Sequence, residues 1–146
     1  MIRNAQNERI AGISYIASKK DSMPDNVSSI KVSLERLDDF AESYPDLLGV
    51  RFIKCDVEGY ELMVFRGSWR VLTQARPIVI TEVGNYDRLH SYEERSLFRF
   101  FMEMRYIFFA IDANGITLHP LQEPWDRPEG CIQDVLMVPE EMKNIL

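Results

Sequence analysis

Hydrophobic positions along the chain alternate between the period of a strand and the period of a helix. Extended patterns occur at residues 10–17, 50–56, 77–83, 106–112, 116–119 and 131–138, and helical spacing occurs at 34–44, 60–74 and 91–104. Residues 77–83 are almost continuously apolar, which is typical of a strand buried on both faces. This alternation of strands and helices predicts an α/β domain with a mainly parallel sheet.

Within this pattern, residues 60–74 are expected to form one helix that buries a stripe of Leu62, Phe65, Trp69 and Leu72. The chain has 146 residues, which is the size of one ordinary domain. We expect residues 1–29 to be an N-terminal remnant and loop, and residues 30–146 to form the domain.

Charge and cysteine content exclude several classes of function. The chain carries 17 basic and 23 acidic residues, and this net charge of −6 argues against nucleic acid or an anionic membrane as a partner. Cys55 and Cys131 provide neither a disulfide framework nor a metal-ligand spacing. A cytoplasmic protein is therefore expected, with Cys55 as an inert thiol inside a buried strand.

Acidic residues gather where a predicted strand ends and a predicted helix begins. Asp56, Glu58 and Glu61 lie at this junction, and Glu82 lies near the end of the next strand. In open α/β sheets, ligands bind beyond the carboxyl ends of the strands. If the two strands are neighbours, Asp56 and Glu82 reach one ligand.

A purely structural interpretation of these carboxylates is also open. Glu58 and Glu61 suit the positive end of the helix dipole, so replacing Glu61 is expected to cost only a little helix stability. Lys54 and Glu58 are suitably placed for an ion pair. The residue pattern by itself therefore does not decide whether these carboxylates have a structural role or a catalytic one.

Several segments resemble, in the right order, the motifs of FkbM-family methyltransferases. Residues 52–62 resemble the signature "fiKiDvEGxE", and residues 37–40 resemble the upstream motif "LDdf". Phe65-Arg66-Gly67, residues 76–83 and Met104-Arg105-Tyr106 are similar to the later motifs "lkGa", "kPiiivEv" and "lGY". The resemblance extends from about Ile30 to Val138.

This resemblance implies a Rossmann-like class I fold with S-adenosylmethionine (SAM) as the methyl donor and a hydroxyl of a sugar or natural product as the acceptor. It places Asp56, Glu58 and Glu82 at the site as candidate catalytic residues, with Asp56 also as the candidate cofactor-binding residue. Asp56 is the first candidate to orient or deprotonate the acceptor. A divalent cation bound by Asp56 and Glu82 suits their chemistry, but the spacing demands none.

The chain departs from the family pattern at its N-terminal side. The Gly-rich turn and the ribose-binding acid of class I enzymes belong upstream of Ile30, where Gly12 stands alone. We therefore expect the C-terminal portion of a catalytic domain, without its first strands, that binds SAM weakly by itself. Residues 52–56 would form an exposed sheet edge, covered by a second copy or by a partner chain.

Two other functions remain open at this point. The chain can be a catalytically inactive half-domain that acts as a partner-binding or oligomerising module. It can also be a metal-dependent hydrolase that uses Asp56, Glu58 and Glu61. The hydrolase is the weaker alternative, because no histidine lies near these carboxylates in the sequence.

Overall fold

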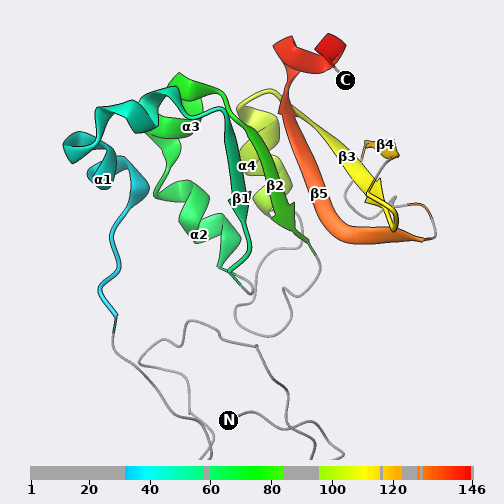
Figure 1. The fold of residues 1–146 in the computed structure, drawn as a ribbon, viewed down its shortest axis with the longest axis horizontal. Coiled ribbons are helices and arrows are strands. Elements are labelled where there is room, and N and C mark those ends of the chain that lie inside the picture. Colours follow the sequence, from blue (N-terminus) through cyan, green and yellow to red (C-terminus); the bar gives the residue numbers. More distant parts are fainter. Residues whose placement is uncertain are drawn as a thin grey trace, which may run out of the picture. The chain divides into compact units, whose positions relative to one another are not determined.

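The computed structural model describes residues 32–57, 60–83, 96–115, 117–122, 128 and 130–145. The chain divides into two compact units, Met1–Leu34 and Glu35–Leu146. All helices and strands described below belong to the second unit (Figure 1).

The second unit is built around a five-stranded sheet. Its strands are β1 (Phe52–Cys55), β2 (Ile78–Glu82), β3 (Tyr106–Asp112), β4 (Leu118–Leu121) and β5 (Cys131–Pro139). The spatial order is β1-β2-β5-β3-β4. β1 and β2 pair in parallel, whereas β5 pairs antiparallel with both β2 and β3, and β4 pairs antiparallel with β3.

The α/β class is confirmed, but the expectation of a mainly parallel sheet is wrong for these pairings. Only β1 and β2 form a parallel pair among the described strands. A parallel pair needs a crossover, which α2 and α3 provide between β1 and β2. No described helix separates β3, β4 and β5, so the chain returns antiparallel. β1, β2 and β3 still run in one direction, and β5 lies between β2 and β3 in the opposite direction.

The helices expected over 34–44 and 60–74 are shorter than the hydrophobic pattern predicts, whereas residues 91–95 of the helix expected over 91–104 lie outside the described residues. The α-helices are α1 (Leu37–Ser43), α2 (Glu61–Arg66), α3 (Trp69–Ala75) and α4 (Ser96–Glu103), and the 3₁₀ helices are η1 (Pro45–Gly49) and η3 (Glu140–Ile145). The single helix expected over 60–74 is wrong, because the chain turns at Gly67 and Ser68. This turn changes the helical phase and leaves Trp69 47% exposed, while Leu62 and Leu72 are buried as expected.

The two faces of the sheet differ in what covers them. On one face, α2, α3 and α4 pack against the sheet through Leu62, Phe65, Leu72 and Phe101, with the Phe65 and Phe101 rings edge to face at 4.8 Å. The other face carries an apolar strip. Its members are Ile78, Ile80, Ile107, Phe109, Ile111, Leu118, Leu136 and Val138, with Met142 of η3 packed against them. Among the described helices, η3 is the one that contributes to this strip.

None of the described helices has the length and apolar character that crossing a bilayer requires.

Candidate functional site

Asp56 follows directly after β1, at the carboxyl end of the sheet. Its side chain is 47% exposed, and the Oδ2 atom lies 3.4 Å from Nζ of Lys54. Because side chains alternate along a strand, this ion pair places Lys54 and Asp56 on the same face. Lys54 is paired in register with Ile80, so this is the face that carries the apolar strip.

Glu82 is the last residue of β2 and lies beside Asp56. Cys55 and Thr81 are partners in the parallel register, so Asp56 and Glu82 occupy the next position on neighbouring strands. Such strands lie about 4.8 Å apart. The structure therefore brings these two predicted residues to one end and one face of the sheet.

Asp134 of β5 is a third acid that the sequence analysis missed. It is the antiparallel register partner of Glu82, and both side chains are half-buried. The register thus brings a third acidic residue to the end of β2 that carries Glu82. No local motif marks Asp134, because only the insertion of β5 beside β2 brings it to this place.

The remaining predicted residue, Glu58, lies outside the described residues. In the part of the chain that the structure describes, no group of three or more His, Cys, Asp or Glu side chains is arranged to hold a metal ion. The divalent cation on Asp56 and Glu82 remains a prediction.

Cys55 lies on the opposite face from Asp56 and points into the core. It is 4% exposed, and burial raises the pKa of its thiol to about 12, helped by the nearby carboxylates of Glu61 and Asp56 and opposed by the Thr81 hydroxyl. Such a thiol is protonated and unreactive at neutral pH. The expectation of an inert core cysteine is confirmed for Cys55.

Glu61 is buried, whereas the sequence analysis expects it to interact mainly with the dipole of the helix that it begins. It is only 2% exposed, and its Oε1 accepts a hydrogen bond of 3.2 Å from the backbone N–H of Val57. The side chain therefore reaches back over the turn that joins β1 to α2. Glu61 holds the backbone next to Asp56, which is more than an interaction with a helix dipole at the surface.

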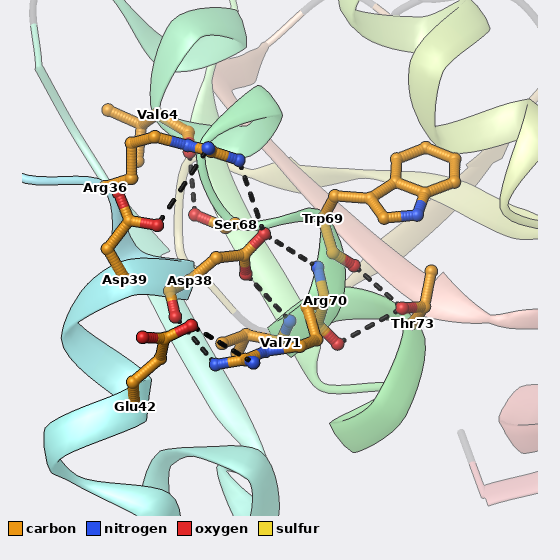
Figure 2. Close-up of polar contacts among 10 residues, drawn as sticks. All are labelled: Arg36, Asp38, Asp39, Glu42, Val64, Ser68, Trp69, Arg70, Val71 and Thr73. Atoms are coloured by element: carbon orange, nitrogen blue, oxygen red, sulfur yellow. Dashed lines mark hydrogen bonds and ion pairs between the residues drawn. The ribbon is translucent and has the colours of Figure 1, made fainter.

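The upstream motif Leu37-Asp38-Asp39-Phe40 joins two helices through the side chain of Asp38. Asp38 is buried, and its two carboxylate oxygens accept the backbone N–H groups of Arg70 and Val71 at 2.9 and 3.0 Å. These groups belong to the first turn of α3, which has no capping side chain of its own (Figure 2).

Further bonds hold the same motif in place. The Asp38 N–H donates to the Gly67 carbonyl at 2.9 Å, and the Arg70 guanidinium donates to the Asp38 carbonyl at 2.7 Å. Figure 2 shows Arg36 and Glu42 flanking this contact, with Arg36 3.9 Å from a carboxylate oxygen of Asp38 and Glu42 3.8 Å from Arg70. This motif therefore acts as a clamp between α1 and α3.

An open pocket of about 500 Å³ lies away from the carboxylates, at the opposite end of the sheet. Its lining residues are Arg76, Met104, Arg105, Glu140 and Glu141. Arg76 makes two hydrogen bonds to Glu141, at 2.8 and 2.9 Å, and Arg105 pairs with Glu140 at 2.9 Å. Since these cations are already neutralised, we assign this pocket a structural role in holding η3.

Fold and site together define an α/β protein with a row of carboxylates at the carboxyl ends of adjacent parallel strands. The family comparison specifies this class further. A family model described as "Methyltransferase FkbM domain" matches residues 4–108, which is more than two thirds of the chain. The chain therefore belongs to the FkbM methyltransferase domain family.

This match includes residues upstream of Ile30, where the sequence analysis saw no resemblance, and it ends before β4 and β5. Neither the curated proteins nor the solved structures contain a match to the chain.

Proposed function

We propose that this protein is a SAM-dependent O-methyltransferase that acts on a hydroxyl of a sugar or natural product, and that Asp56 is its acceptor-side catalytic residue. The observation that carries the proposal is the placement of Asp56 and Glu82 side by side, within a chain that belongs to a methyltransferase family. The common direction of β1, β2 and β3 supports a class I arrangement.

The residues of this chain are suited to the acceptor side of the reaction. SAM supplies an electrophilic methyl group, and the acceptor hydroxyl must lose its proton as the oxygen attacks. Asp56 is exposed, so an acceptor can reach its carboxylate. The Lys54 ammonium lies 3.4 Å from this carboxylate and helps to fix its position. Glu82 lies beside Asp56 and would help to orient the same acceptor.

Methyl transfer from radiolabelled SAM to a panel of methyl glycosides tests the proposal, with SAM at millimolar concentration. We expect measurable transfer, and a loss of about 10²-fold in Asp56→Asn, which keeps the shape but not the basic carboxylate. Asp39→Asn is the matched control, because Asp39 is an exposed acid of α1 away from the sheet, and its activity should remain unchanged. Equal activity in both variants would remove Asp56 from the mechanism.

The second candidate is a catalytically inactive module that acts by binding a partner. It is favoured by the edge position of β1, whose one pairing among the described strands is with β2. A complete absence of methyl transfer, from a protein that is folded by circular dichroism, would favour this second function over the first.

A further inference from the structure

Arg76 has a backbone conformation that favours glycine. It follows α3 with a φ of 50°, in the left-handed region, and Arg105 beyond the end of α4 has a φ of 59°. Helices that end in this conformation usually do so with glycine, because a Cβ atom there crowds the following carbonyl oxygen. Such strained positions are kept where surrounding contacts compensate for them. The contacts of the Arg76 side chain therefore indicate what this position does.

The Arg76 guanidinium is held in one orientation by the end of α4. Its Nη1 donates to the Met104 carbonyl at 2.6 Å, and its Nη2 donates to the Arg105 carbonyl at 3.3 Å. Its Cζ atom lies 4.7 Å from the centre of the Tyr106 ring. This ring is fixed in turn, because the Tyr106 hydroxyl donates to the Pro77 carbonyl at 3.0 Å. The guanidinium is thus oriented by contacts that lie outside η3.

The remaining edge of this guanidinium, formed by Nε and Nη2, binds the carboxylate of Glu141. The two hydrogen bonds are 2.8 and 2.9 Å long and form the bidentate pairing that guanidinium groups make with carboxylates and phosphates. Glu141 lies in η3, a helix of six residues, and its side chain is 54% exposed, whereas that of Arg76 is 22% exposed. Glu141 is therefore an anion that the chain itself supplies to a preoriented cation.

An external anion has both the space and the chemistry to compete with Glu141. The open pocket of about 500 Å³ lies beside the pair. A group tethered through a short segment has an effective concentration in the millimolar range, so a free oxyanion at a somewhat higher concentration competes with it. The neighbouring pair of Arg105 and Glu140 adds little resistance, because its side chains are 78% and 43% exposed.

We propose that Arg76 forms an oxyanion site in which Glu141 is the resident ligand, and that a tetrahedral oxyanion such as phosphate replaces this carboxylate and loosens η3. The bidentate donor edge of Arg76 defines the ligand class, since it matches two oxygens of one anion. Met142 of η3 packs against the apolar strip, so loosening η3 also weakens that contact. The site lies at the opposite end of the sheet from Asp56, and the inference does not depend on methyl transfer.

Titration of isotope-labelled protein with inorganic phosphate, followed by NMR, tests the site. We expect the Nε–H resonance of Arg76 to shift with phosphate and to reach saturation. The backbone N–H of Glu140 donates to the Arg105 carbonyl at 2.9 Å and reports on the start of η3. Its hydrogen exchange should become about two- to fivefold faster, which is the change that the loss of one partly exposed ion pair allows. Sodium chloride at equal ionic strength should change both signals less.

Variants of the two partners separate this site from a general effect of salt. Glu141→Gln removes the charged competitor, so it should bind phosphate about two- to fivefold more tightly and exchange faster in η3 before phosphate is added. Arg76→Lys keeps the charge but loses the bidentate edge, so it should lose most of the phosphate response. Arg66→Lys makes the same change at an exposed arginine of α2 and should respond like the wild type.

Three results would overturn the proposal. These are equal responses to phosphate and chloride, unchanged phosphate binding in Glu141→Gln, and a full phosphate response in Arg76→Lys. Circular dichroism checks that each variant is folded. Because Glu141 is exposed, Glu141→Gln decides the question even if Arg76→Lys fails to fold.

Discussion

At the scale of single residues, the carboxylates of this protein have three different roles according to their burial. Asp56 is exposed at a strand end, Glu61 is enclosed beneath the adjoining turn, and Asp38 is bonded to the start of a helix. The sequence presents all three as acids in family motifs. Their surroundings leave the Asp56 carboxylate accessible to solvent, whereas Glu61 and Asp38 accept hydrogen bonds from the backbone.

The role of Glu61 leads to a prediction about stability. In Glu61→Ala the partly buried N–H of Val57 loses its acceptor, so we expect a loss of about 1–3 kcal/mol in the free energy of unfolding. Glu61→Gln keeps an oxygen that accepts the same bond and should retain most of the stability. Urea denaturation measures both effects.

Glu103→Ala is the control for this experiment, because Glu103 is an exposed acid at the end of α4. We expect its effect to stay within about 0.5 kcal/mol. If Glu61→Ala unfolds no more easily than this control, then the carboxylate does not hold the turn next to Asp56.

At the scale of elements, the break between α2 and α3 depends on a contact from another part of the chain. The break leaves the first turn of α3 with N–H groups that need acceptors, and the carboxylate of Asp38 provides them from α1. The apolar residues between 60 and 74 keep a helical spacing on both sides of Gly67. The tertiary contact therefore decides where the second helix begins.

We expect Asp38→Ala to destabilise the protein by about 2 kcal/mol, because it removes a helix cap with two charge-assisted hydrogen bonds. Asp38→Asn should lose less, since its amide oxygen still accepts one N–H. The neighbouring Asp39 is exposed and pairs weakly with Arg36 at 3.9 Å, so Asp39→Ala should change stability by less than about 0.5 kcal/mol. Thermal unfolding of the three variants provides the comparison, and equal losses in the two alanine variants would contradict the clamp.

The contact between Arg76 and Glu141 of the 3₁₀ helix η3 makes the stability of the fold depend on pH. The Arg76 guanidinium, by hydrogen bonding, lowers the pKa of Glu141 from 4.5 to about 2. A lowered pKa in the folded state stabilises the protein fully above pH 4.5, and this contribution disappears as the pH falls towards 2. Glu141 is about half exposed, with 54% of its side chain accessible, so solvent screening limits the effect to about 0.5–1 kcal/mol.

We therefore expect Glu141→Gln to be less stable than the wild type at pH 6 and nearly equal to it at pH 2. Unfolding by urea at both pH values measures the difference, and Glu103→Gln, which changes an exposed acid at the end of α4, serves as the control. The difference in free energy of unfolding between wild type and Glu141→Gln could instead be the same at both pH values. That result would show that the Arg76 contact does not act through this carboxylate.

At the scale of the whole molecule, the helices cover one face of the sheet, while the candidate carboxylates lie at the end of the other face. That face combines an apolar strip with Asp56, Glu82 and Asp134 at its border.

Cofactor affinity is also determined at this scale. No two glycines of the chain lie closer than Gly59 and Gly67, so the sequence contains no Gly-rich turn for close backbone contacts to SAM. We expect calorimetric titration of the chain to give a dissociation constant well above the low micromolar range. Binding at low micromolar SAM would show that other contacts replace such a turn.

The hydrophobic pattern was sufficient to predict most elements, because a buried strand and an amphipathic helix differ in period. Residues 106–112 and 77–83 became β3 and β2 almost as predicted. Helix length was predicted less well, because the turn at Gly67 and Ser68 depends on a contact to α1 that is distant in sequence. The direction of β5 was not predicted, because it depends on pairing with β2, a strand that is distant in sequence.

For the candidate site, the sequence by itself determined the family, the strand-end position of Asp56 and the presence of Glu82 on the following strand. These properties are local, since they depend on residue type and spacing within short segments. Only the tertiary structure decided that Asp134 joins them, that Glu61 is buried and that helices cover the opposite face. These outcomes depend on which segments pair across the sheet, and pairing is set by the summed burial of the whole chain rather than by any single motif.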